Sequence, residues 1–286
     1  MRWQRGTRSR NLDDRRATRT PRRRAVGGGL GLGGIVVVLI ASYFLGIDPM
    51  LFLGGGLGPA SGVDTSAGVG GTFDAGEFRT TPEEEELVDF VSFALDDLQQ
   101  TWHELLPGYR DATLVLFRDA TQSGCGLGQA EMGPFYCPAD QKVYVDLAFY
   151  QELRSRFGAP GDFAQAYVLA HEIGHHLQTL TGISDEIRRL QQADPQARNQ
   201  LSVRQELQAD CFAGVWGHTA ARRGILDPGD IEEGLRAAAA IGDDRIQRMS
   251  GRGVHPESFT HGSSEQRVEW LRRGLEGGDP DLCNTL

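Results

Sequence analysis

The sequence predicts an α+β domain that is mainly helical and carries a small antiparallel sheet, preceded by one transmembrane helix. Apolar residues recur at helical spacing between Leu87 and Trp102, and several later stretches show the same period. Two short runs, residues 112–117 and 142–147, are rich in β-branched or aromatic residues and are typical of strands. One uncharged run, residues 26–47, lies near the N-terminus. The 286 residues therefore divide into a tail, an apolar segment, a linker and one folded domain.

The N-terminal part is predicted to anchor the chain in the cell membrane. Residues 1–25 contain ten arginines and are predicted to be a disordered basic tail. Residues 26–47 would extend about 33 Å as a helix, enough to cross a bilayer core of about 30 Å. Residues 48–80 are predicted to be a glycine-rich linker. Basic residues beside a single span stay in the cytoplasm, so the tail is expected there and the folded domain outside. A cleaved secretory signal is the alternative, because the most apolar stretch, residues 35–47, is short.

The charge distribution argues against nucleic-acid binding by the folded part. The chain has 29 basic and 39 acidic residues, and the tail contains ten of the basic and two of the acidic ones. The remainder therefore has 19 basic and 37 acidic residues, a net charge of −18. A domain this acidic repels a phosphate backbone.

The folded domain is predicted over residues 81–286, beginning with a helix. Thr81, then Pro82 and a run of glutamates, has the composition of a helix start. Ser263 and Gln266 have the spacing of a capping box, which places His261 just before a helix N-terminus. The later helices are predicted over residues 148–157, 162–180, 195–223, 228–249 and 263–275.

The two predicted strands are expected to pair antiparallel, with one edge over the helix of residues 162–180. An exposed edge there would hold an extended peptide by strand addition. The loop between the strands contains Cys125 and Cys137, whereas Cys211 and Cys283 lie much later in the chain. Four cysteines allow three pairings, and Cys125–Cys137 with Cys211–Cys283 is the favoured one, typical of an oxidising exterior. Free buried thiols are the alternative.

The stretch His171-Glu172-Ile173-Gly174-His175 has the HExxH spacing of zinc sites. Residues four apart differ by about 40° around a helix, so His171 and His175 project from one face toward one metal ion. Glu172 lies close to that face and is predicted to be the base that takes a proton from water. The flanks are apolar, and buried imidazoles beside a carboxylate are costly unless a metal compensates them. One Zn²⁺ per chain is therefore the predicted cofactor, with ordinary helix histidines as the alternative.

A catalytic zinc ion commonly takes three protein ligands and leaves one position open. Glu206 is the best third candidate, because it lies in a helical stretch just downstream. Asp210 follows one turn later on the same face and is predicted to accept the free ring N–H of a ligating histidine. Small residues, Ala209 and Gly214 among them, would let this helix approach the HExxH helix closely. The competing third ligands are His218, His255, His261 and, pointing about 100° away from His175, His176.

These motifs resemble those of the bacterial neutral zinc metallopeptidases, membrane-anchored proteins with HEIGHH-type and ELQADC-type motifs. The resemblance covers nearly the whole chain. It includes the opening Met1-Arg2-Trp3, the arginine-rich start before one apolar segment, Leu207-Gln208-Ala209-Asp210-Cys211, and the stretch from His261 to Arg267. It implies a zincin-like peptidase of gluzincin type with Glu206 as third zinc ligand.

The expected activity is hydrolysis of a peptide bond in a peptide or protein substrate. Glu172 would move the water proton to the leaving amine, and His261 is predicted to donate to the oxyanion because it lies in a polar loop within the resemblance. A catalytically silent binding or scaffold protein at the membrane, which keeps the peptidase fold, is the alternative. The presence of Glu172 weighs against it. A zinc hydrolase acting on another kind of bond is a second alternative.

Overall fold

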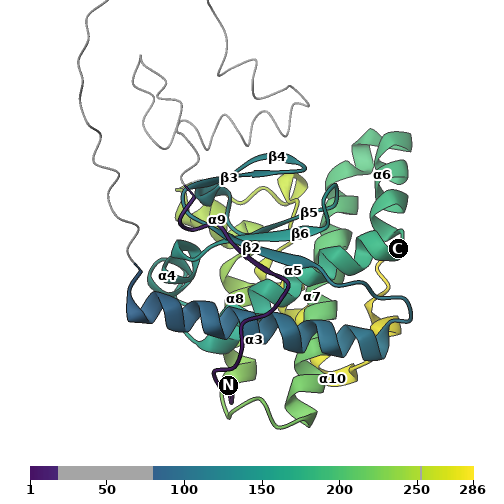
Figure 1. The fold of residues 1–286 in the computed structure, drawn as a ribbon. Helices are drawn as coiled ribbons and strands as arrows, with labels where there is room; N and C mark the ends of the chain where they lie inside the picture. Colours follow the sequence, from purple (N-terminus) through teal and green to yellow (C-terminus); the bar gives the residue numbers. More distant parts are fainter. Residues whose placement is uncertain (19–79, 252) are drawn as a thin grey trace, which may run out of the picture. The chain divides into compact units, whose positions relative to one another are not determined.

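The computed structural model describes residues 1–18, 80–251 and 253–286. The predicted transmembrane segment, residues 26–47, and all of the predicted linker except residue 80 lie outside the described residues. Within the described ranges, no helix is both long enough and apolar enough to cross a membrane. The described part is mainly helical with small sheets, as the sequence predicts (Figure 1).

The first long helix, α3 (Pro82–Leu105), begins where the sequence predicts it. The Thr81 hydroxyl accepts a hydrogen bond from the Glu84 backbone N–H at 3.2 Å, and Pro82 occupies the first turn. Three glutamates lie in that turn, where the helix dipole favours negative charge. The apolar face of α3 is buried in the main core, with Leu95, Leu98 and Trp102 at 2% exposure or less.

The larger sheet is mixed, and the predicted antiparallel pairing of its two central strands was wrong. Its order is β1 (Leu12–Asp14), β2 (Thr113–Phe117), β6 (Lys142–Asp146) and β5 (Phe135–Cys137). Strands β1, β2 and β6 are parallel, and only β5 runs antiparallel to its neighbour. The cause is β5, which lies between β2 and β6 in the sequence. It pairs antiparallel with β6, and β6 therefore runs parallel to β2. Strand β2 is almost wholly buried, as is typical of a parallel strand covered on both faces.

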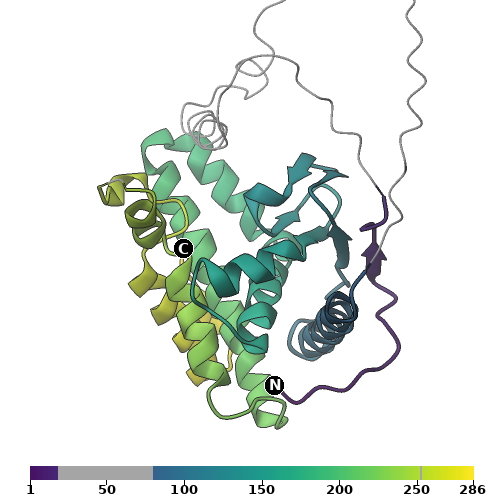
Figure 2. The same ribbon diagram turned by 90° about the vertical axis from the view of Figure 1, so that its left-hand side faces the viewer.

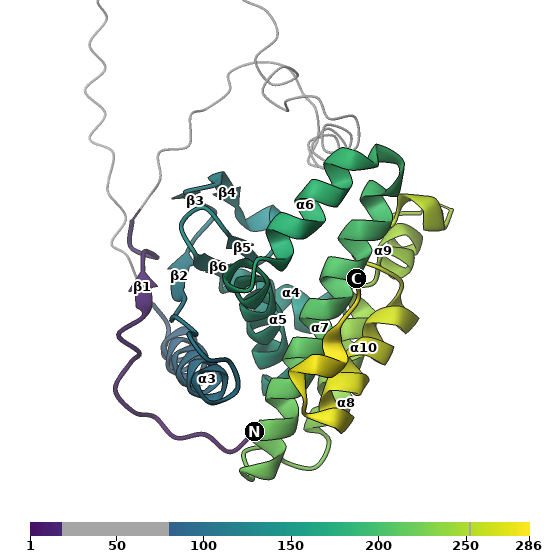
Figure 3. The same cartoon turned by 90° about the vertical axis from the view of Figure 1, so that its right-hand side faces the viewer.

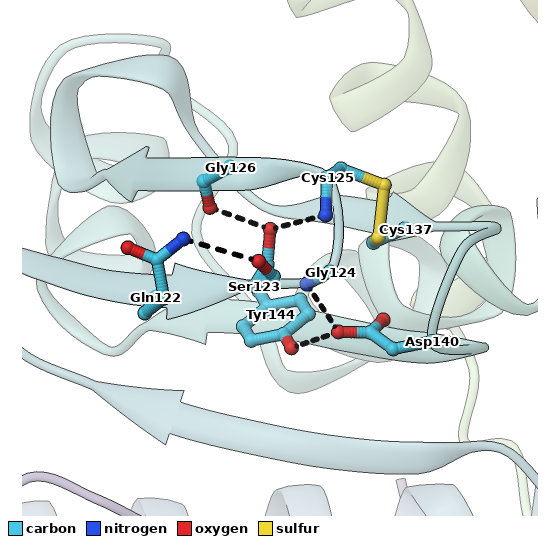
Figure 4. The surroundings of a disulfide bond; sticks show 8 residues. All are labelled: Gln122, Ser123, Gly124, Cys125, Gly126, Cys137, Asp140 and Tyr144. Carbon is cyan, nitrogen blue, oxygen red and sulfur yellow. Dashed lines mark hydrogen bonds between the residues drawn. A yellow bond between two sulfur atoms is a disulfide. The ribbon is translucent and has the colours of Figure 1, made fainter.

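A separate hairpin, β3 (Ala120–Ser123) and β4 (Gly126–Gln129), extends from the same connection. Its turn is tied to β5 by the disulfide Cys125–Cys137 (Figure 4). The Asp140 carboxylate accepts hydrogen bonds from the Gly124 N–H and the Tyr144 hydroxyl, both at 2.6 Å, beneath this bridge. The predicted pairing of the first two cysteines is therefore present in the structure.

The prediction of a disordered tail over residues 1–25 was wrong for residues 1–18, which pack along α3 and contain β1 (Figure 3). The cause is the distribution of charge. Arginines of this segment meet carboxylates near the start of α3, among them Glu85 and Asp89, which bind Arg8. The basic composition predicts disorder, but these ion pairs and the pairing of β1 with β2 hold the segment in place.

The helices form layers on one side of the sheet. Helix α5 (Asp162–Leu180), with the predicted bounds, lies between the strands and α7 (Arg198–Arg222), and α10 (Ser264–Gly277) covers the far side of α7 (Figures 2 and 3). Ser263 and Gln266 form the predicted capping box at the start of α10. The remaining elements are α4 (Ala148–Ser155), α6 (Ile183–Ala193), α8 (Asp230–Ala240), α9 (Asp243–Met249) and the short 3-10 helices η1 (Ala130–Met132), η2 (Pro195–Ala197), η3 (Pro256–Ser258) and η4 (Pro280–Cys283).

The helix predicted over residues 228–249 is divided into α8 and α9, and α6 was missed. The break falls at Gly242, where an added Cβ would lie 2.3 Å from the Ser264 backbone nitrogen. Only glycine permits this approach of the chain to the start of α10. The break also directs Asp243 at the loop before α10, where its Oδ2 accepts from the backbone N–H groups of Thr260 and His261 at 2.7 Å.

Close helix contacts explain the small residues of α7. An added Cβ at Gly174 of α5 would lie 2.9 Å from the Ala209 Cα, so α5 and α7 touch at these two residues. Gly214 instead faces α10, since its added Cβ would lie 2.2 Å from the Leu271 carbonyl oxygen. The second predicted disulfide, Cys211–Cys283, joins α7 to η4 behind this contact.

Candidate metal centre

The two histidines of the HExxH stretch lie on one face of α5. Their ring centroids are 4.8 Å apart and the ring planes are nearly perpendicular, at 88°. The helix around them is buried on almost all sides, so both imidazoles are largely shielded from bulk water. Buried polar rings in such a helix need partners, and these come from α7 and α10.

Helix α7 supplies Glu206, which faces both imidazoles. Its carboxylate oxygens lie 3.1 Å from His171 Nε2 and 3.5 Å from His175 Nε2. One donor atom from each of the three residues lies within 4.8 Å of the other two. Zinc–ligand distances of about 2.0–2.1 Å place tetrahedral ligand atoms roughly 3.3–3.4 Å apart. The observed separations are close to this value, and two imidazoles with one carboxylate are a donor set that suits zinc.

Asp210 lies one turn beyond Glu206 and binds the far nitrogen of His171. Its Oδ1 is 2.8 Å from His171 Nδ1, as the sequence predicts. An Nδ1–H donated to this carboxylate leaves the Nε2 lone pair directed toward Glu206 and His175. Asp210 itself is fully buried, so its charge needs compensation.

The compensation comes from Arg267 of α10 and from Tyr167 of α5, to which the sequence analysis assigned no role. Arg267 Nε and Nη2 each donate to a different oxygen of Asp210, both at 2.9 Å. The Tyr167 hydroxyl donates to Asp210 Oδ1 at 2.6 Å. Arg267 is 2% exposed. The only sequence signal for Tyr167 is its position one helical turn before His171, and Arg267 has none beyond closing the stretch that resembles the family.

His175 also has a hydrogen-bond partner at its Nδ1 atom, which the sequence did not predict. Its Nδ1 lies 2.9 Å from Gln178 Oε1, three residues further along α5. The Gln178 amide donates to Gln208 Oε1 at 3.0 Å, and the Gln208 amide donates to the Cys283 carbonyl oxygen at 3.0 Å. A chain of hydrogen bonds therefore connects His175 with the disulfide-bonded C-terminal segment.

The electrostatics of the centre favour added positive charge. Burial disfavours the imidazolium form of His171, but Asp210 and Glu206 outweigh burial and raise its pKa to about 10. Burial alone would raise the pKa of Glu206, yet His175 and His261 hold it well below its usual value. A divalent cation supplies the same positive charge and leaves both imidazoles as neutral ligands.

Glu172 occupies the position expected of a base. It is 7% exposed and follows His171 directly on α5. Within the part of the chain that the structure describes, its carboxylate accepts no hydrogen bond, so both oxygens remain available to a water molecule. The neighbouring Tyr150 is buried. Burial is the main cause of the raised pKa of its hydroxyl, and the Glu172 charge raises this pKa further.

His261 lies at the rim of the centre. Its side chain is 54% exposed, and its Nδ1 is 3.4 Å from Asp243 Oδ1. Burial opposes its charged form, but Glu206 and Asp243 raise its pKa. Because half of the side chain faces solvent, water screens this effect on the pKa. The His261 and Glu206 charges affect each other's pKa, and Asp243 restrains the His261 ring.

The structure places the other competing histidines in different contacts. His176 is fully buried, with Nε2 2.7 Å from the Arg110 carbonyl oxygen and Nδ1 3.0 Å from the Tyr136 hydroxyl. His218 Nδ1 bonds the Leu275 carbonyl oxygen at 2.9 Å. His255 is exposed beside Glu257. Glu206 is therefore the third donor that the geometry favours.

Removing the Cys211–Cys283 bridge by double substitution to Ser is expected to lower both stability and zinc affinity. The bridge closes a loop with a sequence separation of 72 residues, for which chain entropy predicts roughly 4–5 kcal/mol. It also anchors the carbonyl group that holds Gln208. Denaturant unfolding and chelator competition measure the two effects.

The matched control is removal of the Cys125–Cys137 bridge. Its loop has a separation of 12 residues, so the expected loss of stability is about 3 kcal/mol. It ties the turn of the β3–β4 hairpin to β5 (Figure 4), whereas the hydrogen bonds of Gln208 involve Gln178 and Cys283. Equal zinc affinity in the two double variants would refute the proposed link to His175.

Comparisons with known proteins point to one family. The family model described as "Putative neutral zinc metallopeptidase" matches residues 1–286. The "Uncharacterized protein YpfJ" of Escherichia coli is 46% identical over 297 aligned positions, covering 100% of this chain and 99% of that protein. An uncharacterized protein of Mycobacterium tuberculosis is 41% identical over 257 positions, covering 86% of this chain and 85% of that protein. No solved structure matches the chain.

Proposed function

The chain belongs to the putative neutral zinc metallopeptidase family, and from that premise we propose that it hydrolyses peptide bonds at a zinc centre held by His171, His175 and Glu206. The observation that carries the proposal is the convergence of three donor atoms within 4.8 Å of one another beside Glu172. A zinc ion bound there would lower the pKa of water and polarise a carbonyl group.

The residues around the centre divide the remaining work. Glu172 accepts a proton from the attacking water on one carboxylate oxygen and donates it to the leaving amine. His261, restrained by Asp243, donates a hydrogen bond to the oxyanion that develops on the substrate. Asp210 and Gln178 hold the two ligating rings by their Nδ1 atoms, so that neither ring turns away during the reaction.

Strand β5 is the proposed docking edge for an extended peptide substrate. It lies at one end of the sheet order, and in the described part of the chain it pairs only with β6. The Tyr136 hydroxyl of β5 contacts His176, the residue after His175. A peptide added to this edge would therefore run close to the metal centre.

The catalytic domain is proposed to work in an oxidising compartment. All four cysteines are paired in the two disulfides, and such bonds persist outside the reducing cytoplasm. The acidic composition of the folded part gives no support to nucleic acid as a partner.

The metal is tested directly by elemental analysis of the purified full chain. About one zinc per chain is expected, and His171→Ala or His175→Ala should abolish its retention at neutral pH, because two ligands do not complete the site. His255→Ala, a change of an exposed histidine, is the matched control and should retain zinc. Stoichiometric zinc in the double variant of His171 and His175 would place the site elsewhere.

A further inference from the structure

The N-terminal strap, residues 1–18, is an integral part of the folded unit. It forms one compact unit with the chain after residue 78. Its strand β1 pairs in parallel with β2, with Leu12 opposite Leu114 and Asp14 opposite Leu116. The Leu114 N–H donates to the Asn11 carbonyl oxygen at 2.9 Å, and the Arg15 N–H donates to the Leu116 carbonyl oxygen at 2.8 Å. The strap thus completes one edge of the sheet.

Side chains also hold the strap against α3. The Trp3 ring meets Phe90 of α3 edge to face at a centroid distance of 5.5 Å. The Ser9 N–H donates to the Ser92 hydroxyl at 2.6 Å, a buried contact. The Ser9 hydroxyl in turn donates to Asp96 at 2.6 Å. These contacts are specific in position and are not a general attraction between basic and acidic surfaces.

Arg16 anchors the strap to α3 by a buried charge. Its side chain is 2% exposed, and its guanidinium lies 2.7 Å from Asp14, 3.0 Å from Glu85 and 3.0 Å from Glu84. Burying a guanidinium is unfavourable unless carboxylates surround it, and here two of the three come from α3. The same arginine cannot keep this environment if the strap and α3 are separated by a lipid bilayer.

We infer that the strap and residues 80–286 occupy the same aqueous compartment, so that the chain between residues 18 and 80 begins and ends on the same side of any membrane. A single crossing would separate β1 from β2. This inference replaces the sequence-predicted topology, with residues 1–25 in the cytoplasm and the catalytic domain outside. Together with the disulfides, it places the strap outside the cytoplasm.

Labelling of single cysteines in the full-length chain tests the inference. Gly6→Cys reports on the strap, because an added Cβ there meets no atom within 4 Å. Glu257→Cys reports on the catalytic domain, with a side chain that is 76% exposed. The native cysteines within the described ranges are all disulfide-bonded and give little background. Cells producing each variant are treated with a membrane-impermeant maleimide after the outer layers are opened, and again after lysis.

Both cysteines are expected to react before lysis. Protection of both until lysis would also support a shared compartment, but it would contradict the proposed oxidising location. Reaction of one before lysis and of the other only afterwards would overturn the inference. Arg10→Cys and Asp281→Cys, both at exposed positions, form an independent second pair should either first variant fold poorly. The readout involves neither zinc nor activity, so its failure is distinct from failure of the proposed function.

Discussion

Glu172→Gln is expected to abolish peptide hydrolysis while about one zinc per chain is retained. The amide has nearly the shape of the carboxylate, but it cannot accept a proton from water. Removing a general base costs about 10²–10⁴-fold in rate. Zinc should remain, because the donor atoms come from His171, His175 and Glu206, and no described residue depends on Glu172 for a hydrogen bond.

Turnover of a mixed library of fluorescence-quenched peptides, measured beside zinc content, tests this expectation. Glu257→Gln makes the same chemical change on an exposed carboxylate and should leave both quantities unaltered. Equal turnover by Glu172→Gln and the parent chain would remove Glu172 from the mechanism. A parent chain that binds zinc and cleaves no member of the library would instead favour the silent binding or scaffold protein.

The parts of the site that sequence predicts are those encoded by local spacing. His171 and His175 share a face because helical geometry alone relates residues four apart, and the bounds of α5 follow from its apolar period. Asp210 is predicted in the same way, because it lies one helical turn after Glu206 on the same face. The capping box of α10 is equally local. Both disulfides were predicted from position in the chain, which is a weaker argument, and the structure contains both.

The features that sequence did not predict depend on contacts between distant segments. The direction of β6 relative to β2 is decided by the reversal at β5, a strand of three residues with little periodic signal. The N-terminal strap has the composition of a disordered tail, and what orders it is its contacts with the distant elements α3 and β2. The sequence of α8 and α9 predicts one continuous helix. The break at Gly242 depends on its close contact with Ser264, which is distant in the sequence.

Arg267 is the clearest case, because no spacing relates it to Asp210, 57 residues earlier in the chain. Its guanidinium is bound to both Asp210 oxygens, and Nη2 also lies 3.3 Å from the Tyr167 hydroxyl. Burial alone would raise the pKa of Asp210, but Arg267 and His171 lower it, so the carboxylate stays ionised beside the proposed metal ligand His171. Arg267 therefore acts on the metal centre through Asp210, as a positioning residue.

Arg267→Met is expected to lower the free energy of unfolding by roughly 3–5 kcal/mol, since it leaves the buried charge of Asp210 without its main partner. Zinc affinity should fall by about 10- to 100-fold, because Asp210 no longer fixes the His171 ring. Arg267→Lys keeps the charge but cannot bind both oxygens in the same geometry, so it should give intermediate zinc affinity.

Arg272→Met, which replaces an exposed arginine of the same helix, is the matched control. Chelator competition on variants still folded at low temperature separates the two effects: a purely structural role predicts lost stability with parent-like zinc affinity, and that result would contradict the positioning role.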